Sequence, residues 1–283
     1  MKLGAILDSF RQPIRDAIKS AAALGVSGVQ FYTVKGELAP ENLSESGIAD
    51  LKNALASSNL SISALCGDLG GFGFEVAKDN GWKVEKSKRI LDLALKLGAT
   101  VVTTHIGVVP DDQTSVVWKT MADACNELAS YGDKIGATFA VETGPESPEL
   151  LKRFLDGLSA RGVRVNYDPA NLAMVTASDP VAGVAVLKDY IVHTHAKDGV
   201  NYKPCDRARV YHGFASGNPE KIDYASLFKE TPLGEGAVKW PDYIAALRKI
   251  GYDGFLTIER EVGENPARDI GKAVRFLTPL LNG

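Results

Sequence analysis

The segment Ile191-Val192-His193-Thr194-His195-Ala196-Lys197-Asp198-Gly199 begins as an apolar strand and ends in polar residues followed by a turn glycine. Alternate side chains of a strand share one face, so His193 and His195 point the same way. Neutral imidazole is the commonest metal ligand in proteins and a common proton carrier. The short His-x-His motif also fits two hydrogen-bonded core histidines, and we expect His193 to pack inside the protein and to orient its neighbours.

The same order of apolar strand, polar end and amphipathic helix recurs along the whole chain. Eight strand-helix units follow one another, with strands expected at residues 3–7, 26–32, 60–66, 100–105, 137–142, 163–168, 190–196 and 254–259. The expected helices include residues 84–97 and 112–131. This series predicts a single α/β domain over residues 1–283, a (β/α)8 TIM barrel. A doubly wound sheet is the alternative, but the chain contains neither a dinucleotide-binding nor a P-loop motif.

Composition indicates an ordinary globular protein. The 283 residues are 45% hydrophobic and 24% charged, with a net charge of -3. A mildly acidic chain has no overall electrostatic case for binding nucleic acid. The apolar run at residues 3–7 is too short for a signal peptide, and no run approaches the roughly 20 residues that span a bilayer. The three cysteines suggest no disulfide framework. We therefore expect a cytoplasmic protein with neither a nucleic-acid nor a membrane partner.

Polar or reactive residues follow most of the expected strands. They are Asp8, Gln30, Asp68, His105, Glu142, Asp168, His195 and Glu259. In a barrel the C-terminal ends of the strands converge on one face, where active sites are built. Carboxylates crowded there repel one another unless positive charge lies among them. This need for positive charge predicts a bound cation.

The last four strands supply the candidate metal ligands, which are Glu142, Asp168, His195 and Glu259. A set of carboxylate oxygens and one imidazole nitrogen suits one divalent ion: Mn²⁺, Mg²⁺, Co²⁺ or Zn²⁺. Any one of these carboxylates alone is more simply explained as a helix cap or a surface residue, and Asp168 could cap the turn at Pro169. Four such residues at consecutive strand ends favour the metal.

A long stretch at residues 199–238 follows strand seven without clear periodicity. Segments of this length between elements are usually functional, so we expect a lid over the barrel mouth, with Arg207 available for a phosphate or carboxylate. Packing against a second subunit is the alternative. Lys197 could act on a substrate oxygen, support a neighbouring carboxylate or form a surface ion pair.

The sequence resembles the xylose isomerase-like TIM-barrel superfamily of sugar (phosphate) isomerases and epimerases. The resemblance covers nearly the whole chain and rests on the segments Val141-Glu142-Thr143-Gly144, Asn166-Tyr167-Asp168-Pro169-Ala170-Asn171, His195-Ala196-Lys197-Asp198, Pro232-Leu233-Gly234-Glu235-Gly236, Gly251-Tyr252-Asp253-Gly254 and Ile258-Glu259. It implies the same four metal ligands and makes Glu142 and Glu259 the catalytic acid/base pair. It also implies that His105 lies at the substrate or at a second metal.

Two positions depart from the pattern of the superfamily. Many members carry a histidine where this chain has Asn171, and the ketose 3-epimerases carry an arginine where it has Asn201. These departures weaken a close match to the ketose 3-epimerases. We assign His105, Asn171, Lys197 and Arg207 to substrate binding.

The expected function is that of a metal-dependent isomerase or epimerase of a sugar, sugar phosphate or polyol. Proton transfer would proceed through a metal-stabilised enediolate. The alternatives are an inosose-type dehydratase on the same metal, an endonuclease IV-like phosphodiesterase and a barrel that binds sugar without catalysis. Since superfamily members are often dimers or tetramers, a homo-oligomer is expected. The sequence names neither the sugar nor the metal.

Overall fold

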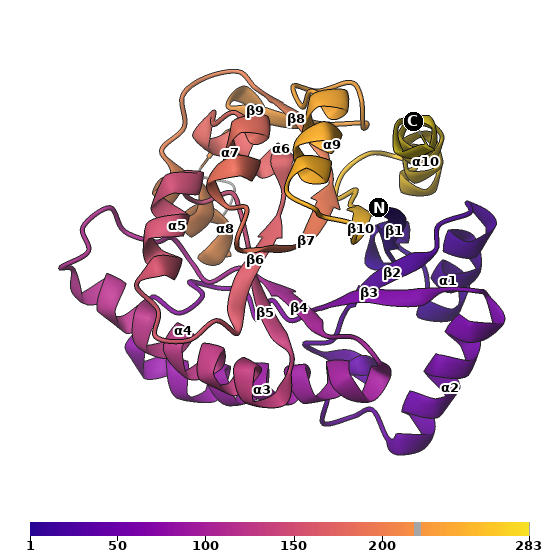
Figure 1. Ribbon diagram of the computed structural model, residues 1–283, viewed down its shortest axis with the longest axis horizontal. Coiled ribbons are helices and arrows are strands. Elements are labelled where there is room, and N and C mark those ends of the chain that lie inside the picture. Colours follow the sequence, from indigo (N-terminus) through magenta and orange to yellow (C-terminus); the bar gives the residue numbers. More distant parts are fainter. Residues whose placement is uncertain (218–221, 283) are drawn as a thin grey trace.

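Eight parallel strands close into a barrel in the computed structural model, which describes residues 1–217 and 222–282 (Figure 1). Neighbouring strands of the barrel follow the order of the chain, and the last strand closes the ring by pairing with the first. The strands are β1 (Lys2–Ile6), β2 (Gly28–Tyr32), β3 (Ser61–Cys66), β4 (Val101–Thr104), β5 (Thr138–Glu142), β6 (Val163–Tyr167), β7 (Ile191–Ala196) and β10 (Phe255–Ile258). The predicted (β/α)8 barrel is confirmed.

Helices surround this barrel, and the last of them packs against β1 (Figure 1). They are α1 (Ile14–Ala23), α2 (Glu45–Ser57), α3 (Ala77–Leu97), α4 (Val116–Ile135), α5 (Pro148–Asp156), α7 (Pro180–Val186), α9 (Trp240–Lys249) and α10 (Pro266–Asn282). Shorter helical turns occupy Asp8–Phe10, Gly36–Leu38, α6 (Pro169–Asn171), Leu172–Thr176 and Tyr224–Ser226. No helix within the described ranges is long and apolar enough to cross a membrane.

Two helices begin at residues other than those predicted. Helix α3 starts at Ala77 instead of residue 84, because its first two turns carry no apolar stripe that periodicity could reveal. Helix α4 starts at Val116, where the Ser115 hydroxyl accepts the Trp118 N–H at 3.1 Å. The Asp112 carboxylate instead accepts the backbone N–H of Thr114 at 2.8 Å, and such local bonds compete with helix formation.

The segment after β7 is more regular than the sequence predicts. It contains the helix α8 (Arg207–Ala215) and the two antiparallel strands β8 (Asp198–Asn201) and β9 (Phe228–Thr231). Each is too short for its periodicity to show. Residues 218–221 of the predicted loop lie outside the described part of the chain. Val210 of this segment packs in a separate apolar cluster with Ala170, Met174 and Val175, which lie in the helical turns that follow β6.

The buried carboxylate of Asp198 anchors the return of this segment to the barrel. It accepts hydrogen bonds of 2.9–3.2 Å from the backbone N–H groups of Gly199, Gly234, Gly236 and Val238 and from the indole N–H of Trp240. The two carboxylate oxygens thus provide hydrogen-bond acceptors for four backbone N–H groups and one indole N–H group. Asp198 therefore acts as a structural residue beside the barrel mouth.

Replacing Asp198 with Ala should lower the free energy of unfolding by at least about 3 kcal/mol, because several buried donors lose their partner at once. Urea unfolding measures this loss. Asp198→Asn keeps one acceptor oxygen and should lose less, and the exposed Asp189→Ala should stay within about 0.5 kcal/mol of the parent. A loss below about 1 kcal/mol in Asp198→Ala would show that the donors find other partners.

Candidate metal centre and active site

Four neighbouring strands place the predicted ligands at one mouth of the barrel. Glu142 is the last residue of β5, Asp168 follows β6, His195 lies near the end of β7 and Glu259 follows β10. Each side chain is buried, and each offers one ligand atom that lies within 4.8 Å of the other three. The barrel therefore brings together all four residues that the sequence singles out.

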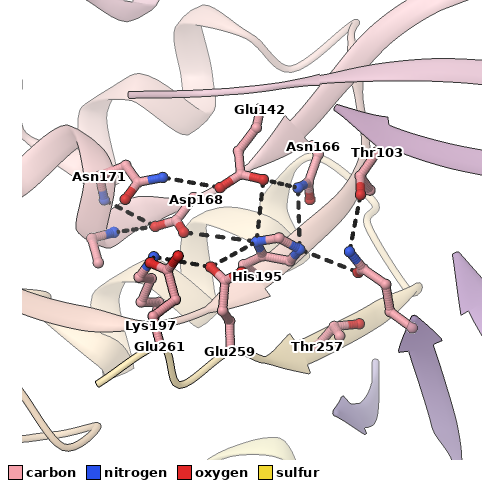
Figure 2. Close-up of polar contacts among 12 residues, drawn as sticks. Thr103, Glu142, Asn166, Asp168, Asn171, His195, Lys197, Thr257, Glu259 and Glu261 are labelled. Carbon is pink, nitrogen blue, oxygen red and sulfur yellow. Dashed lines mark hydrogen bonds and ion pairs between the residues drawn. The ribbon is translucent and has the colours of Figure 1, made fainter. Parts of the chain in front are cut away.

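The imidazole Nδ1 of His195 faces the three carboxylates. It lies 3.5 Å from Glu142 Oε2, 3.7 Å from Asp168 Oδ2 and 3.3 Å from Glu259 Oε2 (Figure 2). His195 Nδ1 and Asp168 Oδ2 are buried and have no hydrogen-bond partner among the described residues. Burying a polar atom without a hydrogen bond costs free energy, so a ligand that pairs with both atoms would stabilise the cluster. Three carboxylate oxygens and one imidazole nitrogen around one point fit a divalent cation.

One carboxylate oxygen of Asp168 caps a helical turn, and the other faces the candidate metal centre. Its Oδ1 accepts the backbone N–H groups of Ala170 at 2.8 Å and Asn171 at 2.9 Å, which begins the helical turn α6. Its Oδ2 is left to face His195 (Figure 2). The cap that the sequence offers as an alternative to metal binding is therefore present, and it orients the other oxygen toward the candidate centre.

A chain of hydrogen bonds fixes the orientation of His195. Gln30 Oε1 lies 3.2 Å from His195 Nε2, while the Gln30 amide N–H donates to Thr103 Oγ1 at 2.9 Å. The Gln30 amide oxygen can only accept, which favours a proton on His195 Nε2, although the Asn166 amide nitrogen also lies 3.2 Å from Nε2. Once Nδ1 loses its own proton, it faces the carboxylates as a bare ligand atom. Asn166 donates to Glu142 Oε2 at 3.1 Å and accepts from His193 Nδ1 at 2.8 Å. The predicted packing role of His193 is confirmed.

Gln30→Leu should weaken the binding of Mn²⁺ by about 10- to 100-fold, because the imidazole loses the acceptor that sets its tautomer. Titration calorimetry on the chelator-stripped protein measures this affinity. Gln30→Glu is the matched control, since it keeps an acceptor oxygen at the same place and should bind at least as tightly as the parent. Unchanged affinity in Gln30→Leu would show that other contacts hold the imidazole.

The charges of the centre shift the pKa values of its groups. Burial lowers the pKa of His195, but the neighbouring Glu142 and Glu259 outweigh burial and raise it well above the usual range. Burial raises the pKa of Glu259, but Lys197 and His195 outweigh burial and leave it well below the usual range. Burial and the charge of His195 keep the pKa of His193 low, so His193 is neutral. In the metal-free protein, His195 is therefore protonated and forms ion pairs with Glu142 and Glu259.

Three of the predicted substrate-binding residues lie beside the carboxylates. His105 Nδ1 is 2.9 Å from Asp68 Oδ2, and His105 Nε2 is 3.8 Å from Glu142 Oε1. Burial lowers the pKa of His105, but Glu142 and Asp68 raise it to about 10. Asn171 donates its amide N–H to Glu142 Oε1 at 2.9 Å. The buried Lys197 ammonium pairs with Glu259 Oε2 at 3.0 Å and with Glu261, so the surface ion pair considered from the sequence is not what forms.

A cavity of about 1000 Å³ opens above these residues. Its wall includes His105, Glu142, Asn171, His195, Lys197 and Glu259, together with residues of the segment that follows β7. One of these is Tyr211 of α8, whose ring lies 6.0 Å from that of His105. A Cβ on Gly144, which has a φ of +147°, would lie 2.3 Å from the Tyr211 hydroxyl. Glycine at this position therefore lets α8 close over the carboxylate mouth.

Arg207 has a different position from the other predicted substrate-binding residues. It is not among the described residues that line this cavity. Its guanidinium donates to the carbonyl oxygens of Val109 at 2.9 Å and Pro145 at 3.2 Å and pairs with Asp111 at 2.9 Å. These contacts tie the start of α8 to two loops of the barrel.

The sequence alone assigns no role to several residues of the site. Gln30 and Asp68 lie at strand ends, so the sequence places them near the site. It does not show that Gln30 contacts His195 or that Asp68 contacts His105. Asn166 lies in a motif of the superfamily, but within that motif the sequence assigns a ligand role only to Asp168. Glu261 carries no signal in the sequence, and Tyr211 is one of several aromatic residues of the expected lid, which the sequence does not connect with His105. Only the folded chain brings these two residues to Lys197 and His105.

The fold and the site define a class, which is a (β/α)8 barrel with a candidate metal centre at the C-terminal ends of its strands. The chain belongs to the xylose isomerase-like TIM barrel family, whose model matches residues 18–280.

Known proteins of three kinds are similar to this chain. An uncharacterized protein of Methanocaldococcus jannaschii, MJ1311, is 23% identical over 195 residues, which span 63% of this chain but only 56% of that protein. Fructoselysine 3-epimerase of Escherichia coli O157:H7 is 21% identical over 259 residues, 88% of this chain and 86% of the relative. The crystal structure of the probable 3-DHS dehydratase AsbF of Bacillus anthracis matches with a TM-score of 0.76 at 19% identity and covers 98% of this chain and 99% of that one. That structural likeness concerns the fold alone.

Proposed function

We propose that this protein is a sugar isomerase or epimerase that requires one divalent metal ion, namely Mn²⁺, Mg²⁺, Co²⁺ or Zn²⁺. One observation carries the proposal: three carboxylates and one imidazole surround a point at the edge of a large cavity, and two of their buried atoms have no hydrogen-bond partner in the described part of the chain. The similarity to fructoselysine 3-epimerase over most of the chain supports a sugar substrate.

The two glutamates are placed to move a proton. A proton on a carbon next to a carbonyl leaves only when a base receives it, and the ion, when bound, stabilises the negative oxygen that results. Glu142 and Glu259 face the same point from strands β5 and β10, which β6 and β7 separate. One carboxylate takes the proton while the C–H electron pair shifts toward the carbonyl carbon. The other returns a proton to the opposite face, which gives the epimer. Return to the former carbonyl carbon, with the hydroxyl proton of the adjacent carbon passing to the former carbonyl oxygen, gives the isomer.

The surrounding groups prepare these carboxylates. The Lys197 ammonium holds Glu259 ionised, and the Asn171 amide directs one oxygen of Glu142. His105, whose pKa is raised to about 10, is protonated at neutral pH and can donate a hydrogen bond to a substrate oxygen beside Glu142. Base, acid and hydrogen-bond donor therefore border one cavity.

A dehydratase is the second candidate, and the position of His105 favours it. A protonated imidazole next to Glu142 can give its proton to a leaving hydroxyl after the carboxylate has removed the neighbouring C–H proton. Loss of water from the same anion then replaces proton return. The fold that this chain shares with AsbF accommodates a dehydratase as well.

Solvent exchange tests the proposal directly. The Mn²⁺-loaded protein, incubated in deuterium oxide with D-fructose, D-psicose, D-tagatose, D-xylulose or 2-keto-myo-inositol, should exchange a proton next to the carbonyl of at least one of them. Proton NMR follows the exchange, and mass spectrometry separates an epimer from a dehydrated product. A protein that binds Mn²⁺ but exchanges no proton in any of these, or in the conjugates described below, would contradict the proposal.

A further inference from the structure

The cavity over the carboxylates is larger than a single sugar requires. Pockets that enclose drug-sized ligands run from roughly 300 to 1000 Å³, and this cavity of about 1000 Å³ lies at the upper end of that range. A monosaccharide held at the carboxylate mouth would leave much of it empty. The remaining volume calls for a second chemical group on the substrate.

Helix α8 leads from the reactive centre to this remaining volume. Val210, Tyr211, Phe214 and Ala215 all line the cavity and lie on one face of α8, since residues three and four apart are neighbours on a helix. Tyr211 stands beside His105, and Phe214 lies one turn farther on, roughly 4.5 Å along the axis. The face thus changes from a wall of the reactive centre to an aromatic surface open to solvent.

The wall at this outer part is apolar and aromatic. Phe214 stacks on Tyr224 with ring centroids 4.3 Å apart and an interplanar angle of 12°, and Tyr224 approaches Phe228 at 6.1 Å. Met174 and Val175 complete the wall from the turn after α6. Apolar side chains that are gathered at a cavity, rather than scattered, mark a binding surface.

Two aromatic rings of the cavity lining remain exposed. Phe214 is 53% exposed and Tyr202 is 55% exposed, although both line the cavity. Exposed apolar area costs about 25 cal/mol per Å², so covering these rings with a ligand is favourable. Aromatic rings offer flat faces, which stack on other rings and on the C–H faces of sugars.

We propose that the substrate is a ketosugar conjugate, in which the reacting sugar sits at the carboxylates and a linked second ring stacks on Phe214 and Tyr202. The second ring presents a flat, largely apolar face and is either an aryl group or a further pyranose. This inference rests on the proposed sugar isomerase or epimerase activity and names its substrate class. A free monosaccharide would use only the inner part of the cavity.

Matched pairs of free and conjugated sugars test this inference on the Mn²⁺-loaded protein. The pairs are D-fructose with 1-deoxy-1-phenylamino-D-fructose, and 3-keto-D-glucose with its phenyl β-glycoside. The β-1,4-glucoside of 3-keto-D-glucose tests a pyranose as the second ring. We expect a kcat/KM for solvent-deuterium exchange at least about 10-fold higher for the conjugate in at least one pair. The phenyl and glucosyl arms then identify which second ring is preferred.

Variants show whether the aromatic surface causes the preference. Phe214→Ala should bring the ratio of kcat/KM between conjugate and free sugar down toward one. Trp82→Ala removes an aromatic ring that is equally exposed, at 55%, outside the cavity lining, and should preserve the ratio. Exchange of free sugars at least as fast as that of their conjugates, or a preference that Phe214→Ala leaves intact, would overturn the inference while the proposed function stands. Exchange confined to a free sugar outside these pairs would also overturn the inference, whereas no exchange in any free sugar or conjugate despite bound Mn²⁺ would contradict the proposed function itself.

Discussion

Replacing Glu142 or Glu259 with Gln should each lower kcat by about 10³-fold, within the range that general acid–base groups contribute. Glutamine keeps the size of the side chain but cannot accept a proton at neutral pH. Both carboxylates border the cavity, and their oxygens lie 3.5 Å and 3.3 Å from His195 Nδ1. The rate of product formation is measured with the substrate that solvent exchange identifies.

Solvent-deuterium exchange separates a two-base mechanism from a one-base mechanism. With two bases, the variant that retains the proton-removing carboxylate should exchange deuterium into the substrate but form little product, and the other variant should do neither. Glu149→Gln is the control, because this exposed carboxylate on α5 makes the same change of charge away from the centre. Full exchange in both Glu142→Gln and Glu259→Gln would eliminate the two-base proposal.

Replacing His195 with Ala should abolish stoichiometric metal binding. The parent, purified without chelator, should carry about one divalent ion per chain. Because loss of an outer partner alone costs about 10- to 100-fold in affinity, loss of a direct ligand should exceed 100-fold. Elemental analysis measures the ion per chain, and titration with Mn²⁺ measures the affinity.

A second histidine provides the control for this variant. His212 contacts Glu75 at 2.9 Å and lies outside the cavity lining, so His212→Ala should retain the ion. Metal retained in His195→Ala at the parent level would place the ion elsewhere. No metal in the parent, even after soaking with Mn²⁺, would remove the basis of the mechanism and leave a barrel that binds sugar.

The affinity for metal should also rise with pH. An imidazole binds metal only after it loses its proton, and Glu142 and Glu259 raise the pKa of His195 in the metal-free protein well above about 6.5. Protons therefore compete with the ion through neutral pH, and this competition fades as the pH rises past the raised pKa. Calorimetry across pH in buffers of different ionisation enthalpy should show proton release on binding. Affinity that does not change with pH would contradict this assignment.

The sequence by itself determined the barrel and the four candidate ligands. Strands and helices recur with their own periodicities, and strand order fixes which strand ends meet in a parallel barrel. Glu142, Asp168, His195 and Glu259 could therefore be placed at one mouth without coordinates, and the structure brings them within 4.8 Å of one another. Their role as ligands stays a prediction that metal analysis will test.

The tertiary structure decided which groups surround these ligands. The tautomer of His195 depends on Gln30, which is 165 residues away in the chain, and the charge of Glu259 depends on Lys197, 62 residues away. The aromatic wall formed by Phe214, Tyr224 and Phe228 depends on the packing of short elements whose periodicity is too brief to read. Sequence pattern records the local alternation of apolar and polar residues, whereas hydrogen bonds and ring stacking between distant residues arise only when the closed barrel brings them together.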